Sequence, residues 1–181
     1  MMRLLFKAVL LMAFTFMMTA QSTAQSETLP GDWDGIWRGT LAIITPDGKS
    51  QELAMELHVL PVAGSNRKTW KILYGEGARQ STRPYEIGPV AGEAGRFVVD
   101  EKNGLFIDNH LVGKTLYSQF MVSDSLVTTR FENLGDSMRV ELLLFTITDP
   151  RRTKLTGRDM EVASYRFNTV QKGILKRDKA K

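Results

Sequence analysis

The feature that most constrains the fold is a series of short apolar segments separated by turn signals, which runs through most of the chain. Residues 51–60 show the pattern, because apolar side chains alternate there with charged or polar ones and so lie on one face of an extended strand. Pro46-Asp47-Gly48-Lys49 and Asn103-Gly104 are residue combinations that favour tight reversals. No helical period is sustained after the first two dozen residues. The pattern predicts an all-β domain.

About ten strands follow from this pattern. We expect them at residues 35–45, 51–60, 67–76, 84–90, 96–100, 105–112, 115–122, 125–132, 138–148 and 161–175, with a polar connection over 149–159. Such a series folds as a barrel or a sandwich, and consecutive tight turns favour an antiparallel up-and-down meander. Closing the meander into a barrel removes the exposed edges of the sheet. We therefore predict a closed, up-and-down barrel.

A transmembrane barrel is the alternative use of this pattern. It would need an apolar, lipid-facing band on every strand and aromatic girdles at both ends. The segments at 51–60 and 96–100 carry too many charged residues for such a band. The sequence therefore favours a barrel that faces water.

The first residues have the order of a secretory signal peptide. Arg3 and Lys7 precede an apolar run over residues 8–18, and small or polar residues follow it. Ser22 and Ala24 fill the two positions that a signal peptidase reads. The apolar run is shorter than the ~20 residues of a membrane span, so an uncleaved anchor is the less favoured alternative. No second run is long enough to span, and we expect no membrane span after cleavage.

Three regions result from cleavage after Ala24. They are a signal peptide (1–24), a barrel domain (25–175) and a basic C-terminal tail (176–181) that we expect to be solvated. The net charge of +4 falls by two when Arg3 and Lys7 are removed, and much of the remaining excess lies at residues 172–181. The domain then lacks the clustered basic face that nucleic acid requires.

The sequence contains no cysteine. This excludes disulfides, zinc–thiolate sites and a lipid-modified N-terminal cysteine, so the protein is not a lipoprotein. Small exported domains of animals usually carry disulfides. We therefore expect a bacterial protein that is periplasmic or secreted.

Gly35-Ile36-Trp37, within the segment 31–40, resembles the first strand of lipocalin-like (calycin) barrels. In these barrels a glycine shortly before a tryptophan opens the first strand, and the tryptophan closes the barrel base. The resemblance implies a structural role at the base for Gly35 and Trp37. It also implies an arginine against the tryptophan by cation–π contact, for which Arg130 or Arg166 is the candidate.

Other phrases are similar to those of uncharacterised exported bacterial proteins of this barrel type. They are Tyr74-Gly75-Glu76-Gly77, Arg83-Pro84-Tyr85-Glu86 and Asp100-Glu101-Lys102-Asn103-Gly104-Leu105. This resemblance implies a fold and a compartment, and it implies no activity.

Aromatic residues are the candidates for lining a cavity, because alternate residues of a barrel strand point inward. They serve equally well as ordinary core residues. An apolar cavity above ~300 Å³ would favour ligand binding over a filled interior. The aromatic candidates are Trp37, Trp70, Tyr74, Tyr85, Phe106, Tyr117, Phe120 and Phe131.

The connection around Gly75, Gly77 and Pro84 is the strongest candidate for a binding site, because loops at a barrel mouth commonly carry binding residues. Tyrosine and arginine side chains there suit a carboxylate or sulfate, since guanidinium binds such groups through a two-pronged hydrogen bond. A loop ordered by salt bridges is the alternative. The predicted ligand-binding residues are Tyr74, Glu76, Arg83, Tyr85 and Tyr117.

The two histidines allow a metal hypothesis. Glu56 and His58 share one strand face, and Asp108 and His110 share another. If the two strands met across the lumen, the four side chains would form a metal site or an acid–base pair. Two solvated strand faces are the simpler interpretation, and haem ligation by His110 is less favoured still. We therefore predict no metal and no cofactor.

Familiar catalytic motifs are missing, including the Gly-x-Ser-x-Gly elbow, His-Glu-x-x-His and a phosphate-binding loop. The first hypothesis is an exported, non-enzymatic barrel that binds a small, partly apolar ligand, such as one that carries a carboxylate. The alternative is a structural or interaction module of the bacterial envelope with a packed interior. The third is a metal-free enzyme that uses the Arg/Tyr/Glu cluster. The sequence leaves the identity of the ligand and the oligomeric state open.

Overall fold

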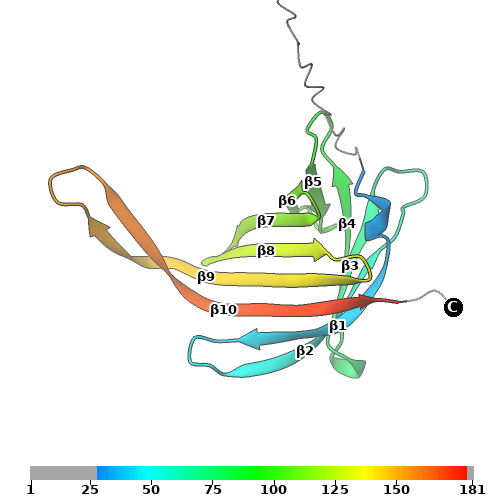
Figure 1. Cartoon of the computed structure of the whole chain (residues 1–181), viewed down its shortest axis with the longest axis horizontal. Helices are drawn as coiled ribbons and strands as arrows, with labels where there is room; N and C mark the ends of the chain where they lie inside the picture. Colours follow the sequence, from blue (N-terminus) through cyan, green and yellow to red (C-terminus); the bar gives the residue numbers. More distant parts are fainter. Residues whose placement is uncertain (1–27, 179–181) are drawn as a thin grey trace, which may run out of the picture.

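The alternating segments pair with one another in chain order and close into a barrel of ten antiparallel strands, with β1 beside β10 (Figure 1). A computed structural model describes residues 28–178. The strands are β1 (Gly35–Ile44), β2 (Ser50–Val59), β3 (Lys68–Tyr74), β4 (Ser81–Pro89), β5 (Arg96–Asp100), β6 (Phe106–Val112), β7 (Thr115–Val122), β8 (Ser125–Asn133), β9 (Ser137–Lys154) and β10 (Glu161–Arg177). The predicted all-β, up-and-down barrel is confirmed.

Two short 3₁₀ helices, η1 (Gly31–Trp33) and η2 (Gly77–Arg79), are the helical elements within residues 28–178. Neither is a bilayer-spanning helix, and no such helix occurs in this part of the chain. The predicted signal peptide, residues 1–24, lies outside the described residues, as do residues 179–181 of the predicted tail.

One end of the barrel is closed by η1 and the residues beside it. Leu29 and Trp33 are buried there, and backbone carbonyls of this segment accept hydrogen bonds from side chains of four strands. These bonds satisfy carbonyl groups that would otherwise be costly to take out of water. The donors are Lys68 to Pro30, Asn133 and Arg177 to Asp32, and Trp37 to Trp33.

Trp37 is completely buried at this base, and the guanidinium of Arg177 lies 4.3 Å from the centre of its ring. The prediction that Arg130 or Arg166 makes this contact is therefore corrected. Arg177 takes the position because β10 closes the barrel against β1 and its register places Arg177 opposite Trp37. Arg130 instead lies on β8, where it pairs with Glu132 at 2.9 Å.

Glycines let the first and last strands approach closely. A side chain at Gly39 would meet the backbone oxygen of Ile174, and one at Gly173 would meet that of Thr40. Gly35 has φ of +146°, a conformation that favours glycine, and lies against the side chain of Arg177. β10 continues past Gly173 to Arg177, so the predicted tail begins later than residue 176.

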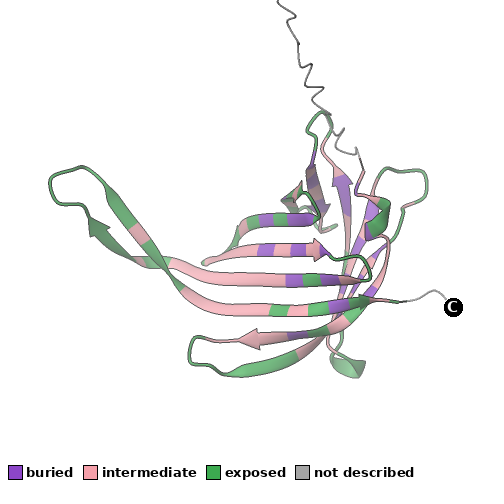
Figure 2. Ribbon diagram, in the orientation of Figure 1, coloured by how far each residue is buried: buried purple, intermediate pink, exposed green. Residues whose placement is uncertain are grey.

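Burial is uneven along the barrel. Figure 2 shows the buried positions gathered toward the end that η1 closes, whereas intermediate positions dominate the other end of β8, β9 and β10. Met138, Val140 and Leu175 are completely buried near the base, but Leu142 and Leu144, further along β9, are only partly buried. The core is therefore concentrated at the closed end, and the opposite end is less densely filled.

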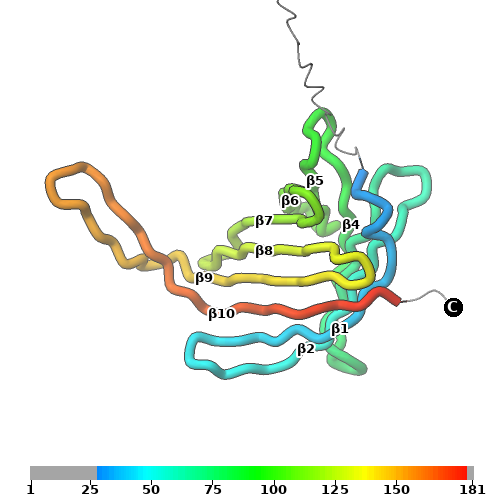
Figure 3. Tube along the Cα trace, in the orientation of Figure 1, coloured from blue at the N-terminus to red at the C-terminus, as the bar shows by residue number. Residues whose placement is uncertain are grey.

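The hairpin formed by β9 and β10 extends beyond the barrel as a two-stranded arm (Figure 3). Its strands stay paired from Arg151 opposite Ser164 to Lys154 opposite Glu161, beyond two register shifts in β10. β9 continues to Lys154, so the prediction of a polar connection over residues 149–159 is wrong for residues 149–154. Pro150 and the exposed charges hide the strand pattern there, because neither face of the arm is buried.

Replacing Arg177 with methionine should weaken the closed base. Methionine keeps an apolar stem but loses the cation–π contact and the hydrogen bonds to Asp32 and Gly135. We expect the free energy of unfolding to fall by about 1–3 kcal/mol, measured by urea denaturation followed through tryptophan fluorescence.

Arg166→Met is the matched control, because Arg166 is exposed on β10. We expect it to change the free energy of unfolding by less than about 0.5 kcal/mol. Equal effects of the two substitutions would contradict the assignment of Arg177 to the base.

Candidate functional site

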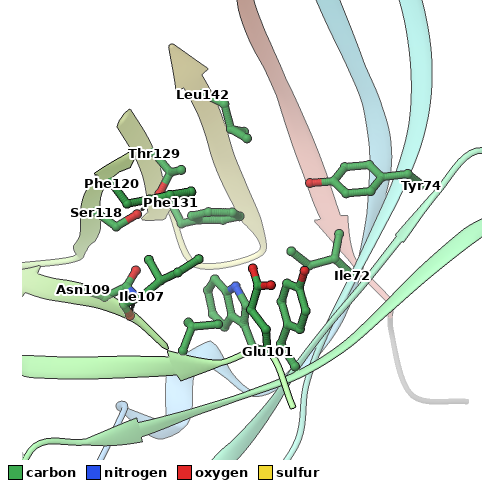
Figure 4. A pocket seen from close by; sticks show the side chains of 13 residues that line it. Ile72, Tyr74, Glu101, Ile107, Asn109, Ser118, Phe120, Thr129, Phe131 and Leu142 are labelled. Atoms are coloured by element: carbon green, nitrogen blue, oxygen red, sulfur yellow. Dashed lines mark hydrogen bonds between the residues drawn. The ribbon is translucent and has the colours of Figure 1, made fainter. Parts of the chain in front are cut away.

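The less densely filled end of the barrel contains a cavity of about 170 Å³ (Figure 4). Inward-facing residues from seven strands, β3 to β9, and from the start of the β5–β6 turn line it, in agreement with the alternation of side chains along each strand. They are Trp70, Ile72, Tyr74, Tyr85, Val99, Glu101, Ile107, Asn109, Ser118, Phe120, Thr129, Phe131 and Leu142.

The floor of the cavity is formed by aromatic rings that rest on the closed base. Trp70 meets Phe131 edge to face with 5.1 Å between ring centroids, and its centroid lies 6.3 Å from that of Trp33 in the η1 segment. Trp70 and Phe131 are almost fully buried. The base and the cavity floor are thus one packed unit, which fixes the depth of the cavity.

Polar groups in the wall are largely satisfied by one another. The hydroxyls of Ser118 and Thr129 lie 2.7 Å apart on neighbouring strands, and both residues are buried. The Asn109 side-chain nitrogen donates to the backbone carbonyl of Ile107 at 2.8 Å. No hydrogen bond uses the Asn109 side-chain oxygen within residues 28–178, so this atom remains an acceptor for a bound molecule.

Two tyrosines add hydroxyl groups to the cavity wall, Tyr85 beside Trp70 in the pairing of β4 with β3 and Tyr74 further along β3. Figure 4 shows the Tyr74 hydroxyl pointing toward the cavity from the side opposite Phe120 and Phe131. Burial raises the pKa of Tyr74 and of Tyr85, and Arg83 partly opposes both shifts. Both phenols therefore stay protonated at neutral pH and can donate hydrogen bonds.

Arg83 supplies a positive charge beside these tyrosines. It lies opposite Ile72 in the pairing of β4 with β3 and two residues before Tyr85 on the same strand, and its charge lowers the pKa of Tyr85. Arg83 is exposed, and no ion pair holds it within the described part of the chain. Glu101 lies on the other side of Tyr85, and its charge raises the pKa of that tyrosine.

Two of the five predicted ligand-binding residues line the cavity, Tyr74 and Tyr85, and Arg83 neighbours them. The other two lie elsewhere. Glu76 lines a separate polar depression with Glu52 and Arg79. Tyr117 is 40% exposed on the outer face of β7, because the alternation of that strand turns its two neighbours inward.

Sequence reasoning missed Glu101 and Asn109. Glu101 directly follows β5 and lies two residues after Val99, so both point into the barrel. Asn109 likewise lies two residues after Ile107 on β6 and shares its inward face. Extending the alternation of β5 by one residue would have found Glu101, and following the alternation within β6 would have found Asn109. The exposure of Phe106 on the outer face of β6 removes it from the predicted cavity lining, and Trp37 lies in the base.

The geometry that the metal hypothesis requires is not formed. Glu56 and His58 are hydrogen-bonded to each other at 3.0 Å on the outer face of β2, and Asp108 pairs with Arg96 on the outer face of β6. Outward-facing pairs on separate strands cannot meet across the lumen. No cluster of three or more potential metal ligands occurs among residues 28–178.

Comparison with known proteins adds information on the fold. No protein-family model and no curated protein matches this sequence. Among solved structures, the S-type phycobiliprotein lyase CPES from Guillardia theta matches with a TM-score of 0.55 at 10% identity, over 83% of this chain and 90% of that chain. The structural match supports a shared fold, a lipocalin-like barrel. Because the identity is so low, activity has to be argued from the site.

Proposed function

We propose that this protein is an exported, non-enzymatic barrel that binds a small, partly apolar ligand in the cavity above Trp70. The observation that carries the proposal is the cavity itself, which lies at the open end above a fixed aromatic floor. A structural module needs no such hollow, because a filled interior is more stable than an empty one.

The size of the cavity limits what enters it. Its volume of about 170 Å³ is below the ~300 Å³ at which pockets for drug-sized ligands begin. It is nevertheless ample for a single ring, since an apolar cavity of ~150 Å³ holds benzene in another protein. The ligand therefore inserts a ring or a short branched chain and leaves its remaining atoms at the mouth.

The mouth favours an anionic group on those remaining atoms. Arg83 has no ion-pair partner within residues 28–178, and Tyr74 and Tyr85 add protonated hydroxyl donors nearby. A carboxylate or sulfonate matches this set of donors. Glu101 and the Asn109 side-chain oxygen are acceptors, and they suit a hydroxyl or amine deeper in the ligand.

The fold neighbour is named as a phycobiliprotein lyase, so this barrel fold is compatible with enzymatic activity in another protein. The cluster proposed for a metal-free enzyme is separated here, because Glu76 lies in the outer depression with Arg79 rather than beside Tyr85. Glu101 stands beside Tyr85 instead. We favour binding because these polar residues border a cavity with a largely apolar lining, which can hold the body of a ligand.

Export is the second part of the proposal. It rests on the signal-peptide pattern of residues 1–24, and it places the protein in the periplasm or outside the cell. The absence of cysteine favours a bacterial protein that is not a lipoprotein. After expression in a bacterial host, N-terminal sequencing of the exported protein should begin at Gln25. A chain that remains in the cytoplasm with residues 1–24 intact would contradict export.

Two fluorescent probes with one aromatic skeleton test the binding site. N-phenylnaphthylamine is uncharged, and anilinonaphthalene sulfonate adds an anionic group to it. Leu142→Trp places a larger side chain in the cavity wall and should abolish binding of both probes. Arg83→Ala should weaken the sulfonate about tenfold or more and leave the uncharged probe unchanged, because it removes one charged hydrogen-bond donor.

Arg79→Ala is the matched control, since Arg79 precedes the same strand but lines the outer depression. We expect it to bind both probes as the unaltered protein does, measured by fluorescence titration. Undiminished binding in the Leu142→Trp variant would place the site elsewhere. Equal losses of both probes in the Arg83→Ala variant would contradict the role of its charge.

A further inference from the structure

The arm formed by β9 and β10 is the most exposed regular element of the described structure. Every residue from 151 to 162 is exposed, and the arm projects beyond the barrel end opposite η1 (Figures 1 and 3). A two-stranded hairpin with both faces in water has little stability of its own. Such an element, kept long and paired, indicates a surface that a partner covers.

The two faces of the arm differ in composition. Lys154 pairs with Glu161 across the hairpin, and Arg152 also forms an ion pair with Glu161 on the same face. This face therefore satisfies its own charges. It resembles an ordinary solvated strand surface.

The opposite face combines large apolar side chains with free cations. The Leu155 backbone N–H donates a hydrogen bond to the Met160 carbonyl at the tip. Val162 lies two residues after Met160 and therefore on the same face of the strand. These three side chains are 50%, 56% and 54% exposed. Arg151 shares this face by alternation from Leu155, and no carboxylate pairs with it within residues 28–178.

The tip adds a second free cation. Arg158 lies in the turn between Leu155 and Met160 beside Asp159, and neither side chain has an ion-pair partner in the described part of the chain. Residues 151–162 carry four basic and two acidic side chains, so the arm as a whole is positively charged. Large apolar side chains beside unpaired arginines match the boundary of an anionic bilayer, where apolar groups enter the acyl region and cations meet headgroups.

An apolar row on the outer face of the barrel leads to the root of the arm. Met121, Leu126, Phe145 and Phe167 are successive cross-strand neighbours on β7, β8, β9 and β10. Met121 is 65% exposed, and the rings of Phe145 and Phe167 lie 5.4 Å apart. This row ends at Phe145 and Phe167, which lie between the two register shifts that separate the barrel from the arm.

We propose that the β9–β10 arm docks this protein on an anionic lipid surface, with Leu155 and Met160 at the acyl boundary and Arg151 and Arg158 against the headgroups. A second copy of the chain is a poorer occupant. Symmetric contact of this face with itself would bring its unpaired arginines together. The proposal does not depend on the cavity being a ligand site.

Vesicle flotation tests the proposal with the chain from Gln25 to Lys181, which contains every described residue of the barrel. We expect binding to vesicles of phosphatidylcholine with about one-third phosphatidylglycerol, and no binding to phosphatidylcholine alone. Added salt should release the protein, because the headgroup attraction is screened. Absence of binding to the anionic vesicles would overturn the proposal.

Two variants assign the binding to the arm. Leu155→Asp/Met160→Asp and Arg151→Glu/Arg158→Glu should each reduce the bound fraction at least about tenfold. Their barrel should stay folded, since these side chains do not contribute to the core. Unchanged circular dichroism and thermal unfolding check this point.

Matched controls carry the same changes elsewhere on the surface. Val112→Asp/Leu134→Asp and Lys114→Glu/Lys172→Glu alter exposed residues outside the arm and should bind as the unaltered chain does. Equal losses in the arm variants and the controls would overturn the assignment. A dimer in size-exclusion chromatography that Leu155→Asp/Met160→Asp dissolves, without vesicle binding, would assign the face to a second copy and overturn the lipid proposal.

Discussion

The pairing of β1 with β10 is the interaction on which the rest of the structure depends. It joins the two ends of the sheet, and its register places Arg177 over Trp37 and brings Asp32 within reach of Arg177. Because the glycines at 39 and 173 allow these strands to approach, the barrel closes tightly at one end. The closed end holds η1, and Trp33 of η1 supports the cavity floor.

The open end follows from the same arrangement. Large apolar residues such as Met138 and Leu175 fill the base, whereas Asn109, Ser118 and Thr129 occupy inward positions higher in the barrel. The Ser118 and Thr129 hydroxyls bond to each other and the Asn109 side-chain nitrogen bonds to the backbone, so these groups are satisfied without a bound molecule, whereas the Asn109 side-chain oxygen stays open to one. A barrel stabilised mainly at its base can keep a hollow above it, at a cost in stability that one packed end offsets.

Much of this architecture could be predicted from local alternation and turn chemistry, because both are short-range properties. Ten strands, their order and the inward position of Tyr74 and Tyr85 follow from such patterns. Alternation alone did not orient β7, since Tyr117 lies on one face and Phe120 on the other, and either could be the core face. Only closure of the barrel decides between them.

Closure of the barrel also explains a further difference between the sequence predictions and the structure. The partner of Trp37 lies at the far end of the chain, and no local signal distinguishes Arg177 from Arg130 or Arg166. The β9 half of the arm escaped prediction because residues 151–154 show no apolar alternation. Residues that act through long-range pairing, or outside the core, are thus the ones that the sequence alone leaves undetermined.

Xenon binding tests the central claim most directly, because xenon enters apolar cavities that are empty and large enough to hold it. A crystal of the protein equilibrated under xenon pressure should show a xenon atom above Trp70, between Phe120 and Phe131, and the Leu142→Trp variant should exclude it. A barrel whose side chains fill this space, with no xenon bound there, would contradict the account of a hollow end above a closed base.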